Sequence, residues 1–209
     1  MAKLLFFGDS ITAPRKNVVV ASELFARRFP QHEIVNKEVP GNDTGLARAR
    51  FQQDVIAEQP RLVVFSFGCN DAAIDVYKGK TTPRIPLEVY LENLAFFIHE
   101  LRDIGAEMLF FTPPPMVMTE TLRAYYGGEP YLSNGFNFML DLFVAAAREL
   151  MAQEAVPVAD VNAAFRQAAG FDEDKLASLL LDGMHPNSAG QQTIFDTLLR
   201  EIGPMLPQT

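Results

Sequence analysis

The chain has 209 residues, of which 48% are hydrophobic, and its formal net charge is −8 at pH 7. This length predicts a single domain over residues 1–209, and the apolar content predicts a packed core rather than a disordered chain. The negative charge argues against nucleic acid as a partner, and the lone Cys69 excludes an intrachain disulfide. The apolar run at residues 4–7 is too short for a signal peptide or a membrane-spanning helix, which predicts a cytoplasmic protein without membrane insertion.

Five short apolar runs have the length and composition of β-strands. They are rich in Val, Ile, Leu and Phe, and they cover residues 3–8, 33–39, 61–68, 107–112 and 156–161. Their apolarity is nearly continuous rather than alternating, which is typical of strands covered on both faces in a parallel sheet.

Helical patterns occupy the segments between these runs. The expected helices cover residues 18–29, 44–58, 86–104, 137–153 and 188–202. The third is the clearest, because its apolar residues repeat every three or four positions between Pro86 and Gly105, which suit a helix start and a helix stop. Asp43 precedes the second helix and is expected to cap it.

The alternation of strands and helices predicts an α/β fold, in which a doubly wound parallel sheet carries helices on both faces. In such sheets, ligands bind at the carboxyl ends of the strands. Two segments, 75–85 and 113–136, fit neither helix nor strand well. The second contains several tyrosines, which suit an acyl pocket, a sugar pocket, a lid or an oligomer contact.

Ser10 follows the first expected strand, at the edge of the sheet where sites form. A serine hydroxyl becomes a strong nucleophile when a base takes its proton, and neutral His185 is the best base in the chain. Asp182 lies three residues before His185 and can orient the imidazole through its other nitrogen. Each motif alone is weak, because a Gly-Asp-Ser turn and an Asp-x-x-His spacing also occur without this chemistry.

Two further turns follow the second and third strands. Gly41 lies in the first turn and Asn70 in the second, and both fall at the same edge of the sheet as Ser10. An oxyanion needs preorganised donors, which the backbone N–H groups of Ser10 and Gly41 and the Asn70 side-chain amide can supply. The alternative is that both turns only cap helices, a role that suits Asp43 and Asp71. The occurrence of all four blocks in order favours the catalytic interpretation.

These blocks resemble the SGNH hydrolase family, also called the GDSL esterase/lipase family. Ser10 in Gly-Asp-Ser, Gly41, Asn70 in Gly-x-Asn-Asp and His185 in Asp-x-x-His match its four blocks in order, over nearly the whole chain. The resemblance implies a flavodoxin-like three-layer α/β/α sandwich with a mostly five-stranded parallel sheet. It also implies Ser10 as nucleophile, His185 as base, Asp182 as orienting acid, and Ser10, Gly41 and Asn70 as the oxyanion hole.

Finer features are similar to the isoamyl acetate esterase branch, which cleaves small acetate esters; they lie at residues 68–72, 85–94 and 112–115. Two positions depart from the family pattern. Glu38 stands three residues before Gly41, where many members carry Gly, and is expected to alter the loop that presents Gly41. Cys69 stands where Ala, Thr or Ser is common, and is expected to be a small buried side chain rather than a nucleophile, since nothing beside it supplies a base.

Four other polar residues have structural interpretations. Asp9 is expected to fix the nucleophile turn by accepting hydrogen bonds from backbone N–H groups, and Asp160 is expected to hold a turn after the fifth strand. His32 and His99 have no serine or carboxylate placed to act with them, so both are expected to be ordinary surface residues.

The predicted function is hydrolysis of small carboxylic esters, carrying acetyl or another short acyl group, through an acyl-serine intermediate. No metal or organic cofactor is needed, and the partner is a small-molecule ester. Within the same chemistry, the substrate can instead be an acetylated sugar, a lysophospholipid or a thioester, and an alcohol can replace water as acyl acceptor. The rival from another class is a non-catalytic binding module on this scaffold, which the presence of every block residue argues against. The oligomeric state is left open.

Overall fold

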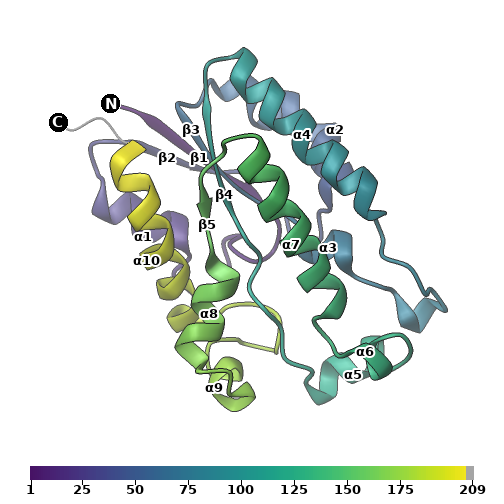
Figure 1. Cartoon of the computed structure of the whole chain (residues 1–209). Helices are drawn as coiled ribbons and strands as arrows, with labels where there is room; N and C mark the ends of the chain where they lie inside the picture. Colours follow the sequence, from purple (N-terminus) through teal and green to yellow (C-terminus); the bar gives the residue numbers. More distant parts are fainter. Residues whose placement is uncertain (206–209) are drawn as a thin grey trace.

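The computed structural model describes residues 1–205, and its centre is a parallel sheet of five strands (Figure 1). The strands are β1 (Lys3–Gly8), β2 (Glu33–Asn36), β3 (Leu62–Ser66), β4 (Glu107–Phe111) and β5 (Val158–Ala159). Their order across the sheet is β2-β1-β3-β4-β5, and every neighbouring pair runs parallel. The chain reverses its direction of travel across the sheet between β1 and β3, and ligands of open α/β sheets bind at such a switch point.

Helices cover both faces of the sheet, which confirms the predicted α/β/α fold class (Figure 1). On one face, α1 (Ala21–Arg28) and α8 (Val161–Ala169) both pack against α10 (Ser188–Met205). On the other face, α4 (Leu87–Asp103) lies between α2 (Thr44–Asp54) and α7 (Phe138–Gln153). The connections carry the shorter elements: η1 (Ile56–Glu58), α3 (Cys69–Ala72), η2 (Val76–Lys78), α5 (Glu120–Tyr126), α6 (Tyr131–Asn134) and α9 (Glu173–Ala177).

Two phenylalanines of β1 show why its apolar run is continuous. The ring centroid of Phe6 lies 5.7 Å from that of Phe25 on α1, whereas the ring centroid of Phe7 lies 5.6 Å from that of Phe51 on α2. All four rings are buried. Since successive side chains of a strand point to opposite faces, a strand covered on both sides is apolar at every position.

Two strands are shorter than their apolar runs predict. β2 ends at Asn36 rather than at residue 39, because Glu38 turns inward and its backbone N–H donates to Asn36 Oδ1 over 3.0 Å. β5 has only two residues of the predicted run 156–161. It ends where the Asp160 carboxylate accepts a hydrogen bond from the Ala163 N–H, so Asp160 is the N-cap of α8 rather than only the holder of a turn.

The helices also differ in places from the prediction. No helix is expected at residues 161–169, yet α8 forms there and buries Val161, Phe165 and Ala169 at helical spacing. The predicted helix 44–58 breaks at Val55 into α2 and η1, and the unassigned segment 113–136 contains α5 and α6. Asp43 caps α2 as predicted, since its side chain accepts a hydrogen bond from the Leu46 N–H.

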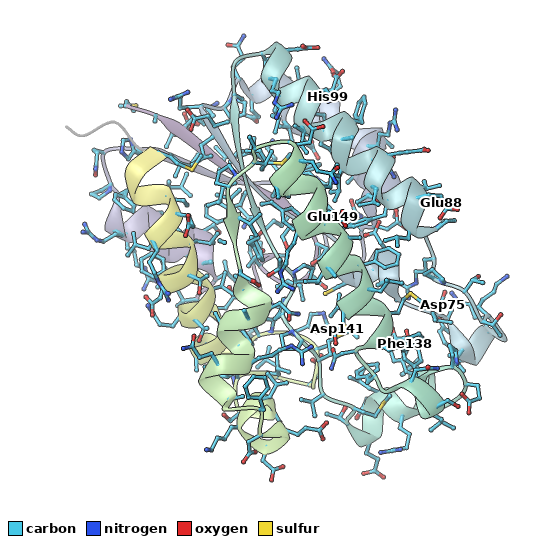
Figure 2. The ribbon with its side chains drawn as sticks, in the orientation of Figure 1. Asp75, Glu88, His99, Phe138, Asp141 and Glu149 are labelled. Atoms are coloured by element: carbon cyan, nitrogen blue, oxygen red, sulfur yellow. The ribbon has the colours of Figure 1, made fainter. Side chains whose placement is uncertain are left out.

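His32 is buried, contrary to its expected surface position. Its Nδ1 accepts a hydrogen bond of 3.1 Å from the Ala2 N–H, so the ring ties the segment before β1 to the segment before β2. His99 is exposed on α4, as expected (Figure 2). None of the helices within residues 1–205 is both long enough and apolar enough to cross a bilayer.

Candidate active site

Three side chains from opposite ends of the chain form a continuous hydrogen-bonded relay. Ser10 Oγ lies 3.0 Å from His185 Nε2, and His185 Nδ1 lies 2.7 Å from Asp182 Oδ2. Ser10 follows β1, whereas Asp182 and His185 precede α10. Both distances are in the ordinary hydrogen-bond range, so the imidazole is placed to accept the serine proton while the carboxylate orients the ring.

The loop that carries Asp182 and His185 is held by its own backbone. Asp182 Oδ1 accepts hydrogen bonds from the N–H groups of Met184 and His185, over 3.0 Å and 2.9 Å. Gly183 has a φ of +93°, and a Cβ there would meet the Val117 carbonyl oxygen at 2.4 Å, so the turn requires glycine. Partial burial acts to raise the pKa of Asp182, but the hydrogen bonds from His185 and Met184 outweigh it and lower the pKa, which keeps the carboxylate charged.

The turn that presents Ser10 is fixed from two sides. Asp9 Oδ1 accepts a hydrogen bond of 2.9 Å from the Ile11 N–H, which is the role expected of Asp9. The Arg15 guanidinium donates to the Ser10 carbonyl oxygen. Both contacts act on the peptide group between Ser10 and Ile11, which favours one conformation of the turn that carries the Ser10 hydroxyl.

Gln191 of α10 links this turn to the segment that carries His185. Its side-chain amide is fully buried; Nε2 donates to the Ile11 carbonyl oxygen over 2.7 Å, and Oε1 accepts from the Ala21 N–H over 3.0 Å. Sequence reasoning missed Gln191, because no motif marks a glutamine in the first turn of an amphipathic helix. The signal in the sequence is its helical spacing from Ile194 and Leu198, which places Gln191 on the apolar side of the helix.

Two backbone N–H groups of the predicted oxyanion hole, those of Ser10 and Gly41, have no acceptor within residues 1–205. Gly41 has a φ of +79°, a left-handed conformation that favours glycine, and no atom lies within 4 Å of the place a Cβ would take. Its turn is joined to Asn70, because Asn70 Nδ2 donates to the Asn42 carbonyl oxygen over 3.0 Å. Donors without an acceptor within the described residues are able to bind a developing oxyanion.

A small cavity opens beside the Ser10 hydroxyl. Its water-accessible volume is about 30 Å³, room for about two water molecules. The segment 113–136 supplies a third of its wall, which consists of Ser10, Ile11, Cys69, Asn70, Ala72, Ala73, Met116, Tyr126, Tyr131, Phe136, Leu140 and Met184. Ser10 and Asn70 therefore face one mostly apolar space, whereas Gly41 lies outside its wall.

Three buried carboxyl groups lie behind the site. Burial raises the pKa of Glu38 to about 8, that of Asp9 to about 7 and that of Asp71 to about 6. Glu38 contacts the Thr12 hydroxyl, and its Oε2 accepts a hydrogen bond of 2.6 Å from the Asn36 amide. Glu38 therefore packs beneath the serine turn, inside the protein.

Cys69 lines the cavity but has the character of a buried thiol. Only 8% of the residue is exposed, and burial, reinforced by the nearby Asp9 and Asp71 carboxyl groups, raises its pKa well above the ordinary value. A protonated thiol is a weak nucleophile, which agrees with the structural interpretation of Cys69. Within the part of the chain that the structure describes, no group of three or more His, Cys, Asp or Glu residues is arranged to hold a metal ion.

Known proteins resemble the chain over most of its length. The model of a family described as GDSL-like lipase/acylhydrolase matches residues 6–193. An acetylxylan esterase from Geobacillus stearothermophilus is 25% identical over 223 residues, which cover 96% of this chain and 94% of the enzyme. The crystal structure of a lipase/acylhydrolase from Enterococcus faecalis superposes with a TM-score of 0.74 at 26% identity and covers 100% of both chains.

A further relative matches only a part of the chain. The uncharacterized lipoprotein YqeF from Bacillus subtilis is 39% identical over 85 residues, which cover 41% of this chain. The match spans only 34% of the length of that protein. It therefore supports relatedness of one segment.

Proposed function

The chain belongs to the GDSL-like lipase/acylhydrolase family, and we propose that it is a serine esterase that hydrolyses esters of acetyl or another short acyl group. The relay from Ser10 through His185 to Asp182, with Ser10 in the wall of a cavity, carries the proposal. The cavity beside Ser10 is small, about 30 Å³ in water-accessible volume, and mostly apolar, which suits an acetyl group better than a long acyl chain. The same intact relay argues against the non-catalytic binding module.

In the proposed reaction, Ser10 Oγ attacks the carbonyl carbon of the ester while His185 Nε2 takes the hydroxyl proton. The oxyanion accepts hydrogen bonds from the Ser10 and Gly41 N–H groups and from the Asn70 amide. When the bond to the leaving oxygen breaks, His185 returns the proton to the alkoxide, and the acyl group stays on Ser10. Water then attacks the acyl carbon and passes a proton to His185, which protonates Ser10 as it leaves. Asp182 stays ionised throughout and stabilises the imidazolium.

A series of p-nitrophenyl esters tests the acyl length and the nucleophile together. We expect the acetate to be turned over fastest, the butyrate more slowly and the octanoate slowest, because the water-accessible volume beside Ser10 is small. Ser10→Ala should abolish turnover and labelling by a fluorophosphonate probe. Wild-type activity in that variant would contradict the serine mechanism, and equal rates on acetate and octanoate would contradict the short acyl group.

An acetylated sugar is the second candidate substrate. The related acetylxylan esterase aligns with 96% of this chain. Tyr77 and Tyr125 are 51% and 48% exposed, with ring centroids 5.4 Å apart. Tyr125 adjoins Tyr126, which lines the cavity. Exposed aromatic rings beside a pocket suit the apolar face of a sugar ring, whose hydroxyl groups can remain in water.

Acetate release from acetylated xylo-oligosaccharides tests this candidate. Tyr77→Ala and Tyr125→Ala should raise KM for the oligosaccharide and leave the hydrolysis of p-nitrophenyl acetate unchanged. Leu132→Ala is the matched control, because it removes another exposed apolar side chain, on α6. Equal KM values for the wild type and both tyrosine variants would exclude a sugar contact at these rings.

Three narrower points belong to the same proposal. The first is that residues 1–209 form one domain. The second is that the small acetate substrate agrees with the isoamyl acetate esterase branch, which the motifs resemble. The third is that the protein acts in the cytoplasm. Because one relative is named a lipoprotein, the location needs its own test. Fractionation of cells that express the native gene should recover the protein with cytoplasmic markers, and recovery with membranes would contradict this location.

A further inference from the structure

The Asn70 side chain is held in one orientation by three partners. Its Oδ1 accepts a hydrogen bond of 3.1 Å from Arg84 Nη1, and its Nδ2 donates to the Asn42 carbonyl oxygen over 3.0 Å and to Asp9 Oδ2 over 3.3 Å. A flipped amide would set its oxygen against two acceptors and its nitrogen against the guanidinium, so only the observed orientation satisfies every partner.

The Arg84 guanidinium is also held by a second partner, Asp75. Its Nε and Nη2 both donate to Asp75 Oδ1, over 3.0 Å and 2.7 Å, and Lys78 Nζ lies 3.0 Å from Asp75 Oδ2. Hydrogen bonds from Arg84, and then from Lys78, hold the pKa of Asp75 below its ordinary value, so this carboxylate is charged. Asp75 lies between α3 and α4, beside the segment that contains α5 and α6 (Figure 2). The guanidinium is therefore clamped at the side of the cavity wall that Asn70 forms.

We propose that Arg84 is a positioning residue for the reaction: its guanidinium holds the Asn70 amide with Nδ2 toward the oxyanion and polarises that N–H. The proposal rests on the esterase function proposed above. A cation on the amide oxygen draws electron density from the nitrogen, and hydrogen bonds to charged partners are about twice as strong as neutral ones. The family motif marks Asn70 but no residue at position 84, so the assignment comes from the contact alone.

The two distances also indicate which N–H of Asn70 donates a hydrogen bond to the oxyanion. Asn70 Nδ2 has two hydrogens, and the contact with Asn42 at 3.0 Å is shorter than the contact with Asp9 at 3.3 Å. The N–H that donates to Asp9 is the one that exchanges this acceptor for the oxyanion. The hydrogen bonds with Asn42 and Arg84 keep the amide plane in place. Without Arg84, the amide has no donor on its oxygen and is held only through Nδ2, so its orientation toward the oxyanion is less fixed.

Steady-state kinetics on p-nitrophenyl acetate test the proposal with matched variants. Arg84→Ala should lower kcat by about 10- to 100-fold with KM within about twofold, because the lost interaction strengthens in the transition state. Arg84→Lys should recover part of kcat by restoring a cation. Lys78→Ala is the control, since it removes the other cation on Asp75 without touching Asn70, and its kcat should equal that of the wild type.

Asn70→Ala and the double variant decide whether Arg84 acts through Asn70. If it does, adding Arg84→Ala to Asn70→Ala should lower kcat no further, because residues that act as a unit are not additive. A full further decrease in the double variant, a wild-type kcat for Arg84→Ala, or an equal loss in Lys78→Ala would each overturn the proposal.

A readout without turnover separates this proposal from the esterase function. In the NMR spectrum, the Asn70 side-chain NH₂ signal, assigned by its absence in Asn70→Asp, should exchange its hydrogens several-fold faster in Arg84→Ala than in the wild type or Lys78→Ala. Unchanged exchange in Arg84→Ala would overturn the positioning role whether or not the protein cleaves esters. Failure of the esterase function would appear differently. Either the wild type would hydrolyse none of the esters, or the Ser10→Ala variant would hydrolyse them as fast as the wild type.

Discussion

The buried carboxyl group of Glu38 makes the stability of the protein depend on pH in a predictable direction. Only 7% of the residue is exposed, and burial raises its pKa from 4.5 to about 8 in the folded protein. The nearby Asp9 carboxyl raises this pKa further, whereas the hydrogen bonds from Thr12 and Asn36 and the charge of Arg15 act to lower it. The folded state therefore binds this proton more tightly than the unfolded state does.

A raised carboxyl pKa stabilises the fold at low pH and loses that contribution as the pH rises from 4.5 through about 8. Each pKa unit corresponds to about 1.4 kcal/mol, so between pH 5 and pH 7 the loss amounts to about 3 kcal/mol. Glu38→Gln removes this dependence and keeps the shape of the side chain. Its oxygen can accept from the Asn36 amide. Its NH₂ replaces the oxygen that accepts from the Thr12 hydroxyl, and that hydroxyl can accept from the NH₂ instead.

Urea unfolding of the wild type and Glu38→Gln at pH 5 and pH 7 measures the difference. We expect the free energies of unfolding to be within about 1 kcal/mol of each other at pH 5, and the variant to be more stable by about 3 kcal/mol at pH 7. Glu33→Gln is the control, because it removes an exposed carboxyl at the start of β2, the strand that precedes Glu38. A difference that does not change with pH, or a variant that is less stable at pH 7, would show that Glu38 is ionised in the folded protein and would refute the reasoning.

Three other perturbations have definite expected outcomes. Asp182→Asn should lower kcat on p-nitrophenyl acetate by on the order of 10⁴-fold with little change in unfolding free energy, because the imidazole loses the carboxylate that sets its tautomer; a kcat within tenfold of the wild type would count against the relay. Gly183→Ala should destabilise the fold by about 2 kcal/mol or more by thermal unfolding, since its φ is +93° and its Cβ would meet the Val117 carbonyl oxygen at 2.4 Å. Gln191→Ala should lower the free energy of unfolding in urea by about 1–3 kcal/mol, because it leaves the Ile11 carbonyl and the Ala21 N–H without their partner. It should also lower kcat; an unchanged kcat would show that Gln191 does not hold the Ser10 turn in its active conformation.

Much of the fold was readable from local pattern. The apolar runs located all five strands, because a strand buried on both faces needs apolar residues at every position, as Phe6 and Phe7 illustrate. The boundaries were less predictable, since β2 and β5 end where Glu38 contacts Thr12 and Asp160 contacts Thr112, in distant segments. The helix at residues 161–169 has an N-cap, Asp160, and apolar residues at helical spacing, and both are local features of the sequence.

The residues of the candidate site also fall into two groups, those that the sequence predicts and those that it does not. Ser10, Asp182 and His185 were predictable because strand-end turns in a parallel sheet meet at one edge, and because Asp182 and His185 are neighbours in sequence. The supporting residues were not, because polar side chains such as Arg84, Gln191 and His32 occur on most protein surfaces. Nothing local shows that Gln191 reaches Ile11 across 180 positions, or that His32 is buried against Ala2.

By itself, the sequence determined the class of fold, the strand edge that holds the site and the residue types of the relay, because these follow from periodicity and from short-range spacing. Only the tertiary structure decided that Ser10 lies 3.0 Å from His185, that the cavity beside it is small and lined by aromatic residues of the segment 113–136, and that Arg84 holds Asn70. These features depend on distances between segments far apart in the chain, which side-chain packing sets and local pattern does not encode.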